Sequence, residues 1–370
     1  MPGPISLKEV CDNSHKRKLK NILKSCMRYS KIQDLPTKWA HFCLNISSFV
    51  HRQAGVSLKG KKVLAGFSGG PDSAALVLAM HYLAPSLNMK LEAAYLDHGL
   101  RREAGEDLAL VQDTCSQLSM ELHLGRSNVS RLAGRGRGGI EETARILRYR
   151  YLHGVARKTG ADYVLTGHHL NDLAEDILMR LQRGTGWPGL SGMRAYVPER
   201  RILRPLLMIP RKCIMDFLET AGQGYVLDAT NKDKTFLRNR VRMSLVPEFE
   251  AINPGFLKSI ANIWRLGRVD ADYWDHILEE ARQDVQEEDL LSGDLLAGMH
   301  QAVRMRLYKK ILDSLGPGQA LVENIFKLDE LWQSRKTGAR VQFPGDKEAL
   351  ISREGIEFRH ISHGTEKKGS

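Results

Sequence analysis

Apolar and polar positions over the first two thirds of the chain alternate between short apolar runs and stretches with helical spacing. The run at 63–67 precedes helix-forming residues from Ala74 to Met80. The other expected strands lie at 91–97, 120–124 and 163–166, and the other expected helices at 104–119, 140–159 and 170–183. Strands that alternate with helices of this length predict an α/β fold with a parallel, Rossmann-like sheet and helices on both faces.

Strands become rarer after Pro205. Helical spacing is found at 210–221, 254–282 and 296–315, followed by strand-like runs at 339–343, 348–353 and 355–358. We therefore expect a mostly helical second domain that ends in a small antiparallel β element. The expected domains are a basic N-terminal extension at 1–38, an α/β domain at 39–245 and a helical, RNA-binding domain at 246–370.

Charge points to a polyanionic partner. The chain has 55 Lys and Arg against 43 Asp and Glu, a formal charge of +12. Residues 1–38 hold nine Lys or Arg against three Asp or Glu, with apolar residues from Leu19 to Met27 at helical spacing. This segment is either a basic amphipathic helix, which packs on the body or touches RNA, or a solvated leader.

The spacing of the cysteines and the hydropathy of the chain indicate the cellular compartment. The five cysteines are Cys11, Cys26, Cys43, Cys115 and Cys213. They are widely spaced and form no Cys-x-x-Cys pair, which argues against a disulfide framework or structural zinc and favours a reducing compartment. Since no apolar run approaches the length of a membrane span and no signal core is visible, we expect a cytoplasmic protein without a membrane partner.

The turn after the first expected strand, Ser-Gly-Gly-Pro-Asp-Ser at 68–73, predicts an anion site. Gly69 and Gly70 allow a tight turn, and the N–H groups at the start of the next helix face whatever fills it. Asp72 lies where a phosphate-bound magnesium ion could be held. An ordinary strand-to-helix connection is the alternative.

Two further groups of polar residues, one after an expected strand and one on an expected helix, are candidate contacts for phosphate or nucleotide. After the second strand, His98 is a candidate nucleotide contact and Arg101 a candidate phosphate contact; a structural role in capping a loop is the alternative for each. Arg145 and Arg148 share one face of the expected helix at 140–159, and a planar guanidinium suits phosphate oxygens. A charged, solvated helix face is the alternative.

The segment Thr166–Asp176 combines histidines with carboxylates. After Gly167, the residues His168, Asp172 and Glu175 are spaced i, i+4 and i+7, which predicts one face of a helix. Such a group could hold a metal, orient an amine or accept a proton. Magnesium fits better than zinc because it prefers carboxylate and phosphate oxygens.

Two later segments are candidate RNA contacts. The glycine-rich stretch 180–193 is long enough to close over a substrate, and its Trp187 could stack on a base; an exposed structural loop is the alternative. Farther along, three arginines fall within five residues, at Arg238, Arg240 and Arg242.

The Ser-Gly-Gly-Pro-Asp-Ser turn resembles the phosphate loop of the PP-loop ATP pyrophosphatases. No Gly-Lys-Ser/Thr follows it, and the Gly-x-Gly-x-x-Gly spacing is missing. Across 61–242 the motifs SGGPDS, LDHGLR, EETARILRYRYL, TGHHLNDLAED, RGTGWPGLSGM, RPLL, DATN and RNRVR follow in the order found in the tRNA(Ile)-lysidine synthetase family. The chain is similar to that family, a group of cytoplasmic bacterial enzymes.

The resemblance implies a ligase that uses ATP and Mg²⁺ to join free L-lysine to the wobble cytidine of tRNA(Ile) with a CAU anticodon; it leaves a homodimer open. The implied catalytic residues are Asp72, Asp172, Glu175 and Arg145, with Asp72 and Asp172 also at the magnesium ion. The implied ATP contacts are Ser68, Gly69, Gly70, Pro71, Asp72, Ser73, His98 and Gly167. The implied tRNA or lysine contacts are Arg101, Glu142, Arg148, His168, Arg183, Trp187, Arg238, Arg240 and Arg242.

The chain departs from the family pattern at Asn171, Leu173 and Asp176. The family commonly has an aspartate where Asn171 stands, so this position bears on selectivity for lysine. Three alternatives remain: a PP-loop tRNA thiolase forming 2-thiocytidine or 2-thiouridine, an ATP-dependent amidating enzyme, and a non-catalytic RNA-binding protein. The thiolase would be expected to carry a cysteine pair, and the amidating enzyme a glutaminase domain or an N-terminal cysteine.

Overall fold

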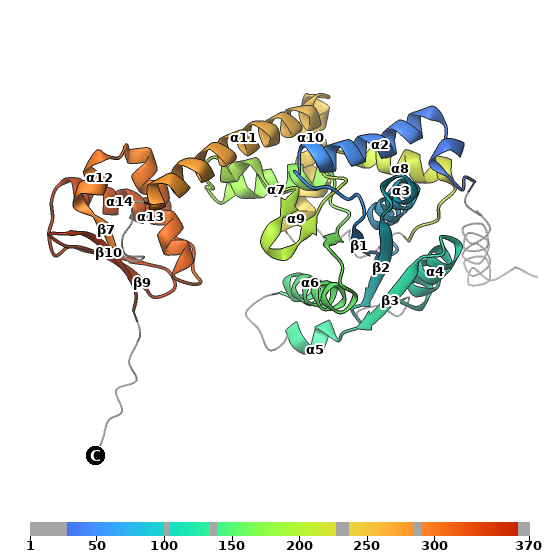
Figure 1. Cartoon of the computed structure of the whole chain (residues 1–370), viewed down its shortest axis with the longest axis horizontal. Coiled ribbons are helices and arrows are strands. Elements are labelled where there is room, and N and C mark those ends of the chain that lie inside the picture. The colour runs from blue at the N-terminus through green and yellow to red at the C-terminus, as the bar shows by residue number, and fades with distance from the viewer. Residues whose placement is uncertain (1–27, 100–103, 134–138, 227–236, 284–289, 362–370) are drawn as a thin grey trace, which may run out of the picture. The chain divides into compact units, whose positions relative to one another are not determined.

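The computed structural model describes residues 28–99, 104–133, 139–226, 237–283 and 290–361. The chain divides into two compact units, Met1–Leu266 and Gly267–Ser370, each of which contains a β-sheet (Figure 1). Among the described helices, none combines the length and the apolar character that crossing a membrane requires.

The sheet of the first unit has the strand order β3-β2-β1-β4-β6-β5, and every neighbouring pair is parallel except β5 and β6. The strands are β1 (Lys62–Gly66), β2 (Lys90–Asp97), β3 (Glu121–Arg126), β4 (Tyr163–Leu165), β5 (Tyr196–Val197) and β6 (Ile202–Leu203). The chain moves outward from β1 to β3 and then returns to pair β4 with the other side of β1. Ligands in open parallel sheets bind outside the carboxyl ends of the strands where the order reverses in this way.

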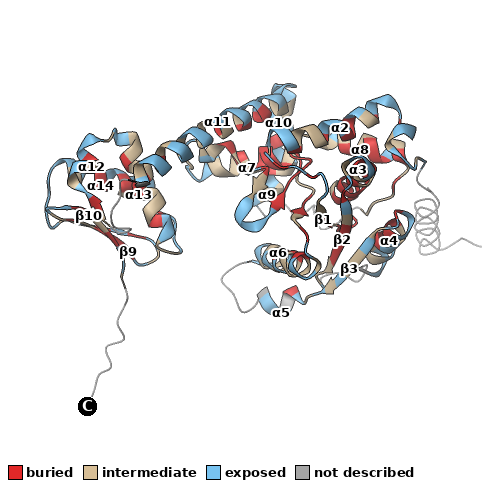
Figure 2. Cartoon of the chain, viewed as in Figure 1, coloured by how far each residue is buried: buried red, intermediate tan, exposed pale blue. Residues whose placement is uncertain are grey.

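Helices cover both faces of this sheet. The described α-helices before α11 are α2 (Thr37–Arg52), α3 (Pro71–Leu87), α4 (Ala104–Gln117), α5 (Val129–Ala133), α6 (Ile140–Thr159), α7 (Leu170–Gln182), α8 (Arg211–Ala221), α9 (Leu237–Arg240) and α10 (Val246–Ile252). Val63 and Ala65 of β1 pack with buried residues of α2, α3 and α8, whereas Leu64 packs with Leu152 of α6 on the opposite face. Figure 2 shows the resulting buried positions along β2 and α3.

The first part of α11 (Phe256–Gln283) belongs to the first unit. Trp264 is buried in a cluster with Leu173 and Ile177 of α7, and its indole N–H donates a hydrogen bond to the Met193 carbonyl at 2.9 Å. The division between the compact units therefore falls inside α11, after Leu266. The expected domain boundaries at 38/39 and 245/246 remain predictions.

The expected basic helix before residue 28 lies outside the described residues. From there on the chain follows the surface of the first unit: Arg28 N donates to the Ala221 carbonyl at 3.2 Å, and the Tyr82 hydroxyl donates to the Tyr29 carbonyl at 3.1 Å.

The second unit packs helices against a four-stranded antiparallel sheet of order β7-β10-β9-β8. Its elements are β7 (Leu290–Ser292), α12 (Gly293–Gly298), α13 (Gln301–Ser314), α14 (Val322–Gln333), β8 (Arg340–Phe343), β9 (Lys347–Ile351) and β10 (Gly355–His360). The expected helical C-terminal region with a small antiparallel β element is confirmed. The stretch 296–315 forms two helices because His300 caps α13, its Nδ1 accepting a hydrogen bond from Ala302 N at 3.1 Å.

Candidate active site

The turn after β1 is closed by the hydroxyl of Ser73. Ser73 Oγ accepts a hydrogen bond from Ser68 N at 3.2 Å and donates one to the Gly70 carbonyl at 2.9 Å. Gly69 has φ of +81°, a conformation that suits glycine. Gly70 is the N-cap of α3, so the unpaired N–H groups of the first helical turn and the positive end of the helix dipole face this turn. The segment 68–73 therefore has the geometry of an anion site.

The end of β4 lies against the beginning of α3. A Cβ atom at Gly167 would lie 2.9 Å from both the carbonyl carbon and the carbonyl oxygen of Asp72, and 3.1 Å from Ser73 N. No side chain fits at that distance. Glycine at this position thus allows the segment after β4 to touch the phosphate loop.

A buried histidine connects the two segments. His169 is 1% exposed, and its Nε2 lies 3.5 Å from Asp72 Oδ1 and 3.4 Å from Asp172 Oδ2. Burial lowers the pKa of His169, but the charges of Asp172 and Asp72 outweigh burial and raise it. The sequence pattern placed His168 on the helical face of Asp172. Because α7 begins at Leu170, His168 precedes the helix and His169 is its N-cap.

Two arginines hold the buried carboxylates of α7. Asp172 Oδ1 accepts hydrogen bonds from Arg238 Nη2 at 3.2 Å and Arg242 Nη2 at 2.8 Å. Glu175 Oε2 accepts from Arg238 Nε at 2.9 Å, and Glu175 Oε1 from Arg242 Nε at 2.6 Å. The arginines come from α9 and from the π-helical turn Val241–Leu245. Arg240, between them, is exposed.

This network fixes the charges of its members. Burial opposes ionisation of Asp172, but the charges of His169 and of the arginines lower its pKa well below the usual range. Burial also opposes the positive charge of Arg242, while Glu175 and Asp172 raise its pKa. Asp172 is therefore a permanent negative charge and a weak proton acceptor at neutral pH.

His168 has the opposite character. Its Nδ1 lies 2.9 Å from Thr166 Oγ1, within hydrogen-bond distance. Burial lowers its pKa to about 3, and the charges of Arg204 and Arg148 act in the same direction. Neutral His168 at the end of β4 is thus suited to hydrogen bonding with an uncharged group rather than to ion pairing.

The other predicted contacts differ in position. The Cζ atoms of Arg145 and Arg148 lie 5.5 and 5.7 Å from the ring centre of Tyr149, one or two turns into α6. His98 directly follows β2, beside β1, at the same edge of the sheet as the phosphate loop. Among the described residues, the exposed side chains of Glu142 and Arg183 form no hydrogen bond or ion pair with the site carboxylates.

Trp187 is 39% exposed in the glycine-rich loop, so stacking on a base remains a prediction. Arg101 and the DATN motif lie outside the described residues.

Three residues near the site make contacts that the sequence did not reveal. Asn171 Oδ1 accepts a hydrogen bond from Arg211 N at 3.0 Å, so this side chain caps α8. An aspartate at that position could accept the same hydrogen bond, so this contact does not explain the departure from the family pattern. His169 had a local signal, since a polar residue three positions before Asp172 fits a helix N-cap. Arg204 begins the RPLL motif, but that motif gave no indication of its burial or its contacts.

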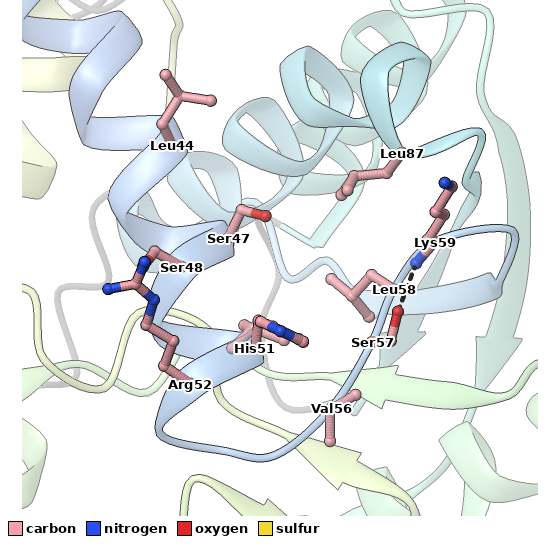
Figure 3. A pocket seen from close by; sticks show the side chains of 11 residues that line it. Leu44, Ser47, Ser48, His51, Arg52, Val56, Ser57, Leu58, Lys59 and Leu87 are labelled. Carbon is pink, nitrogen blue, oxygen red and sulfur yellow. Dashed lines mark hydrogen bonds between the residues drawn. The ribbon is translucent and has the colours of Figure 1, made fainter.

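A cavity of about 350 Å³ lies away from this site (Figure 3). It is lined by the last turns of α2, by the loop before β1 and by Leu87, which ends α3. In Figure 3 the side chains of Leu58 and Leu87 point toward α2. Since α3 spans 17 residues, or about 25 Å at 1.5 Å per residue, this cavity is far from the loop that begins α3.

Another cluster lies at the opposite edge of the sheet. Glu92, Glu121 and His123 are close enough to share a metal ion. However, Lys62 Nζ and Lys90 Nζ each lie 2.8 Å from Glu92 Oε1. Burial raises the pKa of Glu92, but these lysines and His123 lower it to about 2. The lysines supply the positive charge that a cation would bring.

Comparison with known proteins first identifies the class of protein to which the chain belongs. Residues 41–249 match the PP-loop domain family. The structure also resembles the U34-tRNA thiolase NcsA from Methanococcus maripaludis, with a TM-score of 0.53 and 18% identity over 65% of this chain and 84% of that one. At this identity the likeness shows the fold alone. The chain belongs to the PP-loop domain family, and ATP is the nucleotide this family implies.

Proteins with similar sequences identify a narrower family within this class. The chain is 39% identical to a tRNA(Ile)-lysidine synthase from Nitratidesulfovibrio vulgaris, over 82% of this chain and 93% of that protein. It is 30% identical to the tRNA(Ile)-lysidine synthase of Clostridioides difficile, over 74% of this chain and 61% of that longer protein. The chain belongs to the tRNA(Ile)-lysidine synthase family.

Proposed function

We propose that this chain joins free L-lysine to C2 of the wobble cytidine, position 34, of tRNA(Ile) with a CAU anticodon. The products are lysidine, AMP and pyrophosphate. The observation that carries the proposal is the meeting of Asp72 and Asp172 at His169, 3.5 and 3.4 Å from its Nε2. A phosphate loop and a pair of buried carboxylates therefore share one edge of the sheet. Family membership supports the choice of tRNA.

The first step activates the cytidine. Its O2 attacks the α-phosphate of ATP, a new O–P bond forms, and pyrophosphate leaves. The N–H groups at the start of α3 and the hydroxyls of Ser68 and Ser73 are placed to hold the departing phosphates.

Magnesium fits best at Asp72. Asp72 Oδ1 is buried and accepts no hydrogen bond from the described residues, and Mg²⁺ prefers carboxylate and phosphate oxygens. Asp172 Oδ1 is already engaged by Arg238 and Arg242, so Asp172 is the weaker candidate ligand. When bound with ATP, the ion would neutralise negative charge on the phosphates.

The second step transfers lysine. Its ε-amine must lose a proton, forms a bond to C2, and the C2–O2 bond breaks so that AMP leaves with the oxygen. We assign to Asp172 and Glu175 the orientation of this amine by negative charge. Asp172 is too weak a base to remove the proton efficiently because its pKa is lowered.

A sulfur-transfer reaction is less well supported. Of the described cysteines, Cys213 is partly exposed, whereas Cys43 and Cys115 are buried, and burial raises the pKa of each of these two thiols to about 12. Thiols of this kind are poor nucleophiles at neutral pH.

The test is incorporation of labelled lysine into a CAU-anticodon tRNA(Ile) transcript with ATP and magnesium. The matched control is the same transcript with the wobble cytidine changed to uridine. We expect label in the first transcript only, together with AMP and pyrophosphate. ATP cleavage without lysine transfer would instead favour a thiolase or an amidating enzyme. Sedimentation of the same preparation tests whether the protein is a homodimer, which stays part of the proposal.

A further inference from the structure

Arg204 leaves the sheet beside the candidate active site. It directly follows β6, whose Leu203 is in register with Leu165 of β4. Thr166 N donates a hydrogen bond to the Leu203 carbonyl at 3.0 Å, so the residues after β4 and β6 emerge side by side. The segment after β4 carries Gly167, which touches the phosphate loop. Arg204 is therefore at the carboxyl edge where the nucleotide site lies.

The Arg204 side chain is buried with little compensation. It is 6% exposed, and Nη1 donates to the Arg194 carbonyl at 2.6 Å. Its Nε is buried and has no hydrogen-bond partner among the described residues, and no described carboxylate forms an ion pair with it. A buried charge in this state is costly unless a partner neutralises it. A ligand is one source of such a partner.

Neighbouring groups add donors and positive charge. Tyr149 is 8% exposed, and its hydroxyl is also buried without a hydrogen-bond partner in the described part of the chain. Arg145 and Arg148 flank its ring. Burial lowers the pKa of Arg204, and the like charge of Arg145 acts in the same direction, whereas the nearby Tyr149 and the charge of Asp176 oppose them. We call Arg145, Arg148 and Arg204 around Tyr149 the arginine cup.

We propose that the arginine cup binds a phosphodiester group of the tRNA substrate, with Arg204 at its base. Guanidinium forks match phosphate oxygens, and the Arg204 Nε–H, which has no hydrogen-bond partner among the described residues, supplies a further donor. The phosphates of ATP have their own site at 68–73, whereas the cup is carried by α6 and the end of β6. Arg148 is exposed, so the cup opens toward a large ligand in solvent. This inference rests on the proposed tRNA substrate.

The experiment measures binding of the unmodified CAU-anticodon transcript at several salt concentrations, without lysine. The variants are Arg148→Gln at the exposed rim, which carries little risk to folding, and Arg204→Gln at the base. Arg150→Gln is the matched control, because Arg150 is exposed on α6 but lies about 200° around the helix from Arg148. We expect Kd to rise about tenfold in both cup variants and the salt slope of log K to fall by about one, with the control unchanged.

Wild-type Kd and salt slope in a folded Arg148→Gln protein and in a folded Arg204→Gln protein would overturn the inference. So would an increase in KM for ATP without a change in tRNA binding, since the cup would then serve the nucleotide. The proposed function is judged separately by lysine incorporation in the wild-type protein. Loss of tRNA affinity in the cup variants of an enzyme that transfers no lysine would retain the phosphodiester site and reject the ligase.

Discussion

Two buried carboxylate clusters, one in each compact unit, differ in how fully their polar atoms are paired. In the second unit, Asp329 is fully buried and accepts hydrogen bonds from Arg304, Tyr308, Gln301 and Gln333 at 2.8 to 3.2 Å. Among the described residues, no buried side-chain atom of this cluster is left without a partner. All of its members lie on α13 and α14, so the cluster holds two neighbouring helices together.

In the cluster around Asp172 and Glu175 these two carboxylates are well paired with arginines. Several buried polar atoms near them, however, have no hydrogen-bond partner among the described residues. Asp72 Oδ1, both ring nitrogens of His169, Tyr149 Oη and Arg204 Nε are buried without hydrogen-bond partners in the described part of the chain. Buried polar atoms are normally satisfied, and exceptions call for a ligand, an ion or a functional reason. In these two clusters, complete pairing accompanies a structural role, and incomplete pairing accompanies the proposed substrate site.

The largest effect is expected on stability when the structural cluster is broken. Asp329→Asn leaves Arg304 buried without its counter-charge, which we expect to cost about 3–5 kcal/mol of unfolding free energy in the second unit. Denaturant unfolding measures this. Asp313→Asn is the control, because its pair with Lys309 is exposed and contributes about 1 kcal/mol or less. Equal midpoints for the two variants would remove the distinction between the clusters.

The next effect is on activity at the other cluster. Asp172→Asn removes the negative charge that orients the amine, and we expect lysine incorporation to fall by about 10²–10³-fold. Asp176→Asn, one turn along α7, disrupts only a partly exposed pair with Arg180 and should retain activity close to wild type. Initial rates at saturating ATP distinguish them. Wild-type rates in a folded Asp172→Asn protein would remove this residue from the proposed mechanism.

A backbone contact gives a smaller effect. Gly167→Ala places a methyl group 2.9 Å from the backbone of Asp72, so the phosphate loop must shift, and we expect KM for ATP to rise by about tenfold, equivalent to 1.4 kcal/mol. Gly154→Ala meets no atom within 4 Å inside α6 and should leave KM unchanged while stabilising the helix slightly. An unchanged KM in Gly167→Ala would show that the close approach does not shape the ATP site.

The smallest effect is a pH dependence. His168 has its pKa lowered from 6.5 to about 3, so the neutral form is favoured by folding. Its contribution to stability is complete above pH 6.5 and is lost progressively as the pH falls toward 3. Wild type should therefore lose about 1 kcal/mol more than His168→Gln between pH 7 and pH 5.5. If the unfolding free energies of the two proteins changed equally between pH 7 and pH 5.5, the lowered pKa of His168 would be contradicted.

Much of the fold could be predicted because its signals are local. The helix expected at 140–159 is observed as Ile140–Thr159, and the strands expected at 91–97 and 163–166 as Lys90–Asp97 and Tyr163–Leu165. Strands β5 and β6 were not expected, since two residues each are too few to show a period. The break before α13 was missed because an N-cap histidine resembles any other polar residue within a helical pattern.

The site was only partly predictable, because the residues that form its ion pairs are far apart in the sequence. Arg238 and Arg242 contact carboxylates between 63 and 70 residues away, a partnership that spacing along the chain does not reveal. The helix boundary at Leu170 also transfers the role beside Asp172 from His168 to His169.

The sequence by itself determined the alternation of the longer strands and helices, the phosphate loop at 68–73 and the family, because each depends on neighbouring residues and their order. Only the tertiary structure decided which charges are paired. Folding places Arg238 and Arg242 on the carboxylates of α7 but leaves buried Arg204 without one. Burial makes that difference matter, since an unpaired charge costs little in water and much in a protein interior.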